Sequence, residues 1–201
     1  MNLSRNRWIV AAGVTGAAVA VAVTGAVAAN AAQEPAPKAQ VSTPDKPPAA
    51  PGAVGSVIDT GIAAKQGTWV LTFVPVRDAA IPQTDFGVMA GRRQASGAVT
   101  ADVMSNEFDG PAKAPGFHGV QGAMEVEGEP APAFGYYVGD AKKITAKAGG
   151  RTVTASLAAW SEDASVKAFW FDPKITAVSD LRAFDASGEA LVTGHNGVGV
   201  G

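Results

Sequence analysis

The chain has 201 residues, of which 47% are hydrophobic and 17% are charged, and its formal net charge is −2. This mild acidic balance argues against electrostatic binding of nucleic acid. The chain contains no cysteine, which excludes disulfides, thiol catalysis and thiolate metal sites.

The N-terminal segment has the pattern of an export signal or a membrane anchor. Arg5 and Arg7 precede an uncharged run of 22 residues, Trp8–Ala29. A helix of this length crosses a hydrocarbon core of about 30 Å, but the run consists mainly of alanine and valine, which favours removal over retention. Ala29-Asn30-Ala31 fits the small-x-small pattern of a cleavage site at Ala31. We predict a cleaved signal peptide over residues 1–31, with an uncleaved anchor as the alternative; both place the rest of the chain outside the cytoplasmic membrane.

A proline-rich segment follows this N-terminal segment. Large apolar side chains are almost absent from it, so it has little from which to build a core. Six of the thirteen prolines of the chain lie in this segment, at Pro35, Pro37, Pro44, Pro47, Pro48 and Pro51. Because proline fixes φ and removes a backbone donor, we predict a disordered, partly extended linker over residues 32–55.

The remaining sequence is long enough for one domain with its own core, which we place at residues 56–193. Many short apolar runs separated by turn residues predict an all-β fold, either a β-sandwich or a small barrel. The Gly-rich residues 194–201 are predicted to form a flexible tail. One stretch, Gly97–Met104, also allows a short helix.

The clearest local pattern predicts a hairpin over residues 144–157. Gly149-Gly150 can adopt the positive φ values of a two-residue turn. This turn pairs Ala148 with Arg151 and Ala146 with Val153, so that apolar residues share one face. Lys147 and three threonines, Thr145, Thr152 and Thr154, are then expected on the opposite, solvent face.

A second hairpin is predicted near the end of the domain, with a turn at Asp185-Ala-Ser-Gly188. The segment Thr68–Val76 would be apolar on both faces if it is extended, which predicts a central strand with Pro75 near its end. The other predicted strands are Gly119–Val126, Phe134–Val138 and Ser165–Phe171.

Five segments in the second half of the domain form a recognisable pattern, namely Pro115-Gly-Phe-His118, Phe134-Gly-Tyr-Tyr-Val-Gly-Asp140, Ala159-Trp-Ser-Glu-Asp163, Phe169-Trp-Phe171 and Ala183-Phe-Asp-Ala-Ser-Gly188. With these segments the chain resembles small exported proteins of high-GC Gram-positive bacteria. Those proteins combine an Ala-rich export signal, a Pro-rich linker and a hairpin that ends in an aromatic-Asp-Ala-Asp-Gly turn. The resemblance extends over residues 115–192, and Phe184 and Ser187 depart from the turn pattern. It implies an exported location and a β-domain, and it carries over no catalytic residue.

Candidate polar sites are few. The two histidines, His118 and His195, lack the spacing of a zinc site, so a structural or solvated role is expected for each. The segment Ser105-Asn-Glu-Phe-Asp-Gly110 imitates part of a calcium loop, but Gly116 stands where a bidentate carboxylate is needed. Glu125, Glu127 and Glu129 alternate, so on one strand they would share a face, which we expect to be solvated rather than cation-binding. We therefore predict no metal and no cofactor.

Aromatic residues supply the candidate ligand site. Tyr136, Tyr137 and Trp160 could form a platform for sugars or peptides if their rings are exposed. Trp170 alternates with Val166 and Ala168, which is typical of a core strand face.

These patterns favour a non-catalytic binding or structural protein of the cell envelope or the extracellular space. Its expected partner is an unidentified envelope component or extracellular ligand, and it contacts the membrane only through its N-terminal segment. One alternative is a carbohydrate- or peptide-binding module that uses exposed aromatics, and another is a hydrolase of envelope polymers. The hydrolase would need a carboxylate pair or a Ser–His dyad assembled by the fold.

The location can be tested with a reporter fused after Gly201. A reporter that is active only outside the cytoplasm should give a signal, and N-terminal sequencing of the released protein should start at or near Ala32. Activity of a cytoplasm-only reporter would contradict export, whereas full-length chain found only in the membrane would indicate the anchor.

Overall fold

The computed structural model describes residues 52–108, 110–194 and 197–199. These residues form thirteen strands in four antiparallel sheets, without a helix and without a sheet that closes into a barrel. The all-β prediction is confirmed, and the barrel alternative is not realised. The expected export segment over residues 1–31 lies outside the described residues, as does most of the expected linker.

The first sheet has the order β1-β2-β3-β4. Its second strand corresponds to the predicted Thr68–Val76 segment, lies between two neighbours as expected, and ends at Pro75. Its first strand begins two residues before the domain boundary expected at residue 56, because Val54 already pairs with Phe73. The strands are β1 (Val54–Ala64), β2 (Gly67–Pro75), β3 (Phe86–Arg93) and β4 (Val103–Ser105).

The central sheet has the order β11-β12-β8-β5, and the third sheet has the order β10-β9-β13. A small hairpin of β6 and β7 makes the fourth sheet. The central strands are β5 (Gly116–Gln121), β8 (Phe134–Val138), β11 (Ser156–Ala159) and β12 (Val166–Trp170). The remaining strands are β6 (Met124–Val126), β7 (Glu129–Ala131), β9 (Lys143–Ala148), β10 (Arg151–Thr154) and β13 (Ser179–Phe184).

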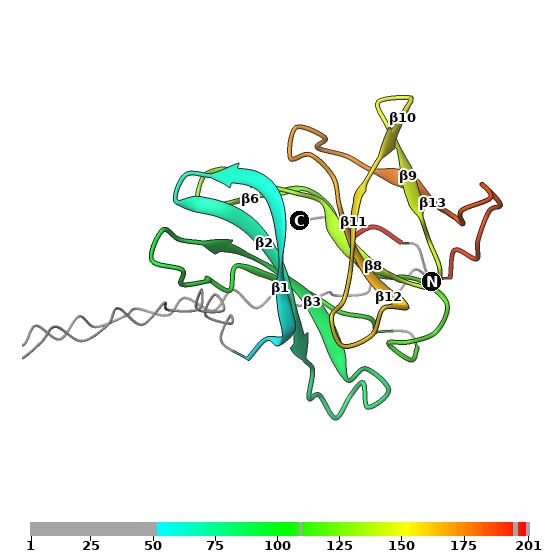
Figure 1. Cartoon of the computed structure of the whole chain (residues 1–201), viewed down its shortest axis with the longest axis horizontal. Coiled ribbons are helices and arrows are strands. Elements are labelled where there is room, and N and C mark those ends of the chain that lie inside the picture. The colour runs from blue at the N-terminus through cyan, green and yellow to red at the C-terminus, as the bar shows by residue number, and fades with distance from the viewer. Residues whose placement is uncertain (1–51, 109, 195–196, 200–201) are drawn as a thin grey trace, which may run out of the picture.

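The three larger sheets form layers, with the central sheet between the other two (Figure 1). Side chains alternate along each central strand, so that each strand contributes to two cores. Tyr136 and Trp170 belong to the core shared with the first sheet, whereas Tyr137 and Phe169 belong to the core shared with the third. The prediction that Trp170 shares a core face with Val166 and Ala168 is confirmed.

The hairpin predicted around Gly149-Gly150 is confirmed in its register. Ala148 pairs with Arg151 and Ala146 with Val153, and the two turn glycines have φ of 53° and 77°. One detail of the prediction is wrong, because Thr145 is buried rather than solvent-facing. It lies on the middle strand β9, where β10 and β13 flank it on both sides.

The second predicted turn is also present. Asp185 Oδ1 accepts a hydrogen bond from the Ser187 N–H over 2.8 Å, and Phe184 bridges to Ala190. The returning segment makes this single bridge instead of a regular strand.

The strand predictions fail where glycines interrupt the pattern. The predicted strand Gly119–Val126 is divided between β5 and β6. The segment Gly97–Met104 is not helical, and its last residues belong to β4. Strand β3 was not predicted at all, since Gly87 and Gly91 break its apolar run. Within the described part of the chain, no helix is long and apolar enough to span a membrane.

The hairpin turn offers a test of the backbone conformation alone. A Cβ atom at Gly149 would meet no atom within 4 Å, so a substitution there changes strain rather than packing. We expect Gly149→Val to lower the free energy of unfolding by about 1–2 kcal/mol, the cost of a side chain in the left-handed region. Gly149→Asn should have much less effect, because asparagine tolerates this conformation. Equal effects of the two variants in urea denaturation would contradict the assigned turn.

Candidate functional site

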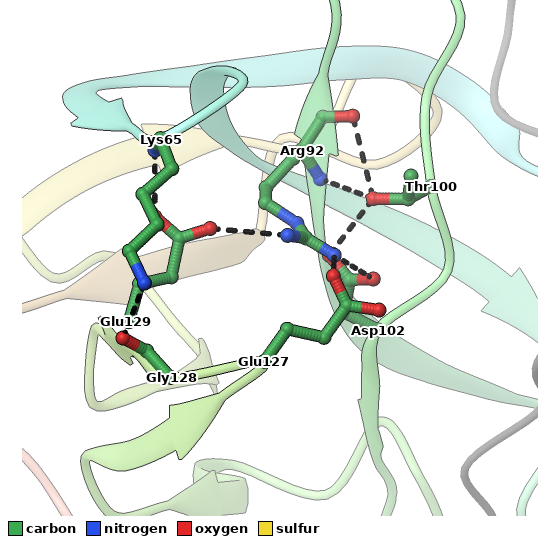
Figure 2. A network of polar contacts seen from close by, with 7 residues as sticks. All are labelled: Lys65, Arg92, Thr100, Asp102, Glu127, Gly128 and Glu129. Carbon is green, nitrogen blue, oxygen red and sulfur yellow. Dashed lines mark hydrogen bonds and ion pairs between the residues drawn. The ribbon is translucent and has the colours of Figure 1, made fainter.

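The largest polar cluster of the described residues is centred on Arg92, near the end of β3 (Figure 2). Its guanidinium is nearly buried and contacts three carboxylates. Arg92 Nε and Nη2 donate to the two oxygens of Asp102 over 2.8 and 3.0 Å, Nη2 donates to Glu127 Oε2 over 2.8 Å, and Nη1 donates to Glu129 Oε1 over 3.0 Å. The guanidinium also lies over the Trp69 ring at 5.8 Å.

Thr100 supports the contact between Arg92 and Asp102. The hydroxyl of Thr100 accepts a hydrogen bond from the Arg92 N–H and donates one to Asp102 Oδ2, both over 2.8 Å. These bonds attach the segment that precedes β4 to the end of β3. A planar guanidinium is suited to such a bidentate carboxylate contact.

On its other side the cluster fastens the β6–β7 hairpin to the first sheet. The second oxygen of Glu129 accepts a hydrogen bond from the Lys65 N–H over 2.7 Å, and Lys65 Nζ donates to the Gly128 carbonyl over 2.6 Å. Glu127, at the hairpin turn, has φ of 51°, which is uncommon for a residue other than glycine. Its side chain is 74% exposed and still pairs with Arg92.

The charges of the cluster favour the protonated arginine. The hydrogen bond to Asp102 makes the largest contribution to raising the pKa of Arg92, and the bonds to Glu127 and Glu129 act in the same direction. These contributions outweigh burial, which lowers the pKa. Three carboxylates face the one guanidinium, and among them only the Glu127 side chain is exposed.

A second polar cluster surrounds His118 on β5. Its Nδ1 lies 3.0 Å from Glu107 Oε2, and its Nε2 lies 2.6 Å from the Ala114 carbonyl oxygen. A carbonyl can only accept, so Nε2 carries a proton, and one further proton lies between Nδ1 and the carboxyl group. The imidazole thus connects the Glu107 side chain to the backbone of Ala114.

The ring of Tyr136 stacks on His118, with centroids 5.1 Å apart. Its hydroxyl is buried without a hydrogen-bond partner among the described residues. Burial, with smaller contributions from Glu107 and Asp85, raises the pKa of Tyr136 well above its ordinary value. The phenol therefore stays neutral at ordinary pH.

The rings expected to form a ligand platform lie in the interior instead. Tyr136, Tyr137 and Trp160 are 0%, 1% and 6% exposed. Tyr137 donates to the Val192 carbonyl, and Trp160 donates to the Val54 carbonyl while its ring stacks on Phe73. These rings close the two cores, so none of them offers a flat face to solvent.

The other polar candidates from the sequence do not form the sites considered for them. Glu125, Glu127 and Glu129 do not share one strand face, since a hairpin turn separates the first from the last and Glu129 is buried. Glu107 of the calcium-like segment pairs with His118, and residue 109 lies outside the described residues, as does His195. The described ranges contain no group of three or more His, Asp or Glu side chains arranged to hold a metal ion.

Sequence reasoning did not find the Arg92 cluster. Its members come from three separate segments, and no spacing between them marks their convergence. The available signal was an arginine pair at the end of an apolar run, followed by acidic residues at the tip of a short hairpin.

The chain matches no protein-family model, and comparison with curated proteins and with solved structures finds no match.

Removing Arg92 should be costly because it leaves Asp102 and Glu129 buried without their cation. We expect Arg92→Met to lower the free energy of unfolding by about 3–5 kcal/mol. Adding Asp102→Asn and Glu129→Gln should restore part of this loss, because the unpaired charges are then removed.

The matched control is Arg182→Met, which breaks an exposed pair with Asp180 and should cost less than about 1 kcal/mol. Denaturant titrations of the four proteins give the comparison. Similar losses for the two arginines would contradict a buried clamp at Arg92.

Proposed function

We propose that the chain is an exported protein of the cell envelope or the extracellular space, with a β-domain whose role is binding or structural rather than catalytic. Export is supported by Arg5 and Arg7 before the uncharged run and by the small-x-small site at Ala31. An interior that is held together without cysteine suits a protein whose stability does not depend on its redox surroundings.

The non-catalytic role is supported chiefly by the hydrogen bonds that the interior polar groups make within the fold. A general base needs a nitrogen or oxygen within hydrogen-bond reach of the substrate proton. His118 directs one nitrogen to Glu107 and the other to the Ala114 carbonyl, and its side chain is buried. Arg92 is likewise directed to three carboxylates. These groups hold segments of the fold together, which leaves them poorly placed to act on a substrate.

Recognition through stacked aromatic rings has little support. Phe108 is the one exposed aromatic side chain in the described part of the chain, and it belongs to a loop. The observations therefore favour contact through backbone edges and polar surface.

The proposal can be tested with purified protein and insoluble envelope polymer, namely peptidoglycan with its attached polysaccharide. Two quantities are measured, the protein that sediments with the polymer and the soluble fragments that are released. We expect no fragments above those of a buffer control. Sedimentation would indicate a polymer-binding role, and its absence would indicate a role towards other partners.

The control variant is His118→Gln, which keeps polar atoms near Glu107 and removes imidazole chemistry. Fragment release by the wild type that disappears in a folded His118→Gln protein would overturn the proposal in favour of a hydrolase. Thermal unfolding of both proteins shows whether the variant is folded.

A further inference from the structure

The edge of the central sheet at β5 is covered by a later segment of the same chain. We call this segment, residues 192–194 and 197–199, the strap. It runs parallel to β5, with bridges between Phe117 and Gly194 and between Gln121 and Gly199. These contacts are made by the described part of a segment that includes residues 194–201, for which a flexible tail was predicted. The strap thus pairs with backbone groups that an edge strand would otherwise present to solvent.

Main-chain hydrogen bonds attach the strap to β5 at two places. At one end, the Phe117 N–H donates to the Thr193 carbonyl over 3.0 Å. At the other end, the Gly199 N–H donates to the Val120 carbonyl and the Gly199 carbonyl accepts from the Gly122 N–H, both over 2.8 Å. The Val198 side chain lies between these attachments and packs, partly buried, against the second core. Bonds of this kind recognise an extended backbone, and the packing of Val198 against the second core adds a side-chain preference.

The shape of the edge restricts what can bind there. A Cβ atom at Gly122 would lie 2.8 Å from the Gly199 oxygen, and one at Gly116 would lie 2.7 Å from Gly194 Cα. On the other side of the contact, a Cβ atom at Gly194 would lie 3.1 Å from the Pro115 oxygen. β5 and its flank therefore have room only for glycine at Gly116 and Gly122, and the strap has little room for a side chain at Gly194, where φ is 54°.

We propose that the β5 edge is a strand-accepting interface between two copies of this chain, each of which inserts its strap beside β5 of the other. A second copy carries the same glycines and the same valine, so the exchanged contact repeats the contacts seen within one chain. This inference concerns contacts among the described residues and does not depend on the proposed function.

The balance between the closed and exchanged forms follows from concentration. Within one chain, the strap is present at an effective concentration of the order of millimolar. A second copy therefore competes only when the protein is crowded or when its own strap is weakened. Dilute protein is expected to be closed and monomeric.

The test uses the full chain and a fluorescent peptide with the sequence of residues 192–199, which represents the strap of a second copy. Val198→Asp weakens the protein's own strap and leaves β5 intact. We expect this variant to bind the peptide at least about tenfold more tightly than the wild type, because internal competition is reduced. Adding Gly122→Val should abolish binding, since its side chain would occupy the place of the Gly199 carbonyl.

A control independent of the fold of the variants is a peptide that carries Asp in place of Val198, which should not bind to the Val198→Asp protein. Binding of the matching peptide to none of the proteins, or equal binding of the two peptides, would overturn the proposal. Exchange between whole chains is measured by mixing donor- and acceptor-labelled wild-type protein at high concentration. Energy transfer that excess peptide abolishes is expected, and no transfer at any concentration would overturn the two-copy interface.

Discussion

The central sheet has apolar side chains on both of its faces, so its stability depends on a sheet packed against each face. Strand β8 is buried at all five positions, with Tyr136 directed to one core and Tyr137 to the other. The first sheet covers one face and the third sheet covers the other (Figure 1). Neither outer sheet spans both cores, which makes the alternation along β8 and β12 the link between the two halves of the molecule.

The buried polar groups act at the margins of this arrangement. Arg92 joins the segment before β4 and the β6–β7 hairpin to the first sheet, and His118 connects Glu107 to Ala114 beside the central sheet. A buried ion pair adds little net stability, but the loss of one partner is costly. These contacts therefore fix the positions of loops and hairpins, while apolar burial supplies the driving force for folding.

Predictions from local sequence patterns were accurate where one short segment contains the whole signal. The Gly149-Gly150 turn determines its own register, and the apolar run that became β2 determines its own burial. Convergence of distant residues was not predictable, as the Arg92 cluster illustrates. The aromatic candidates failed for a related reason, because alternation shows that a ring faces one side of a strand but not that another sheet covers that side. Thr145 was misplaced in the same way, since its burial depends on the neighbouring strand β13.

The central claim, that a sheet buried on both faces holds the domain together, is tested most directly by native-state hydrogen exchange. The account predicts that backbone amides of β8 and β12 exchange only through global unfolding, and that those of the edge strand β10 exchange through smaller local openings. The exchange free energies of β8 and β12 should therefore equal the free energy of unfolding measured with denaturant. Amides of β8 and β12 that exchange as readily as those of β10 would contradict it.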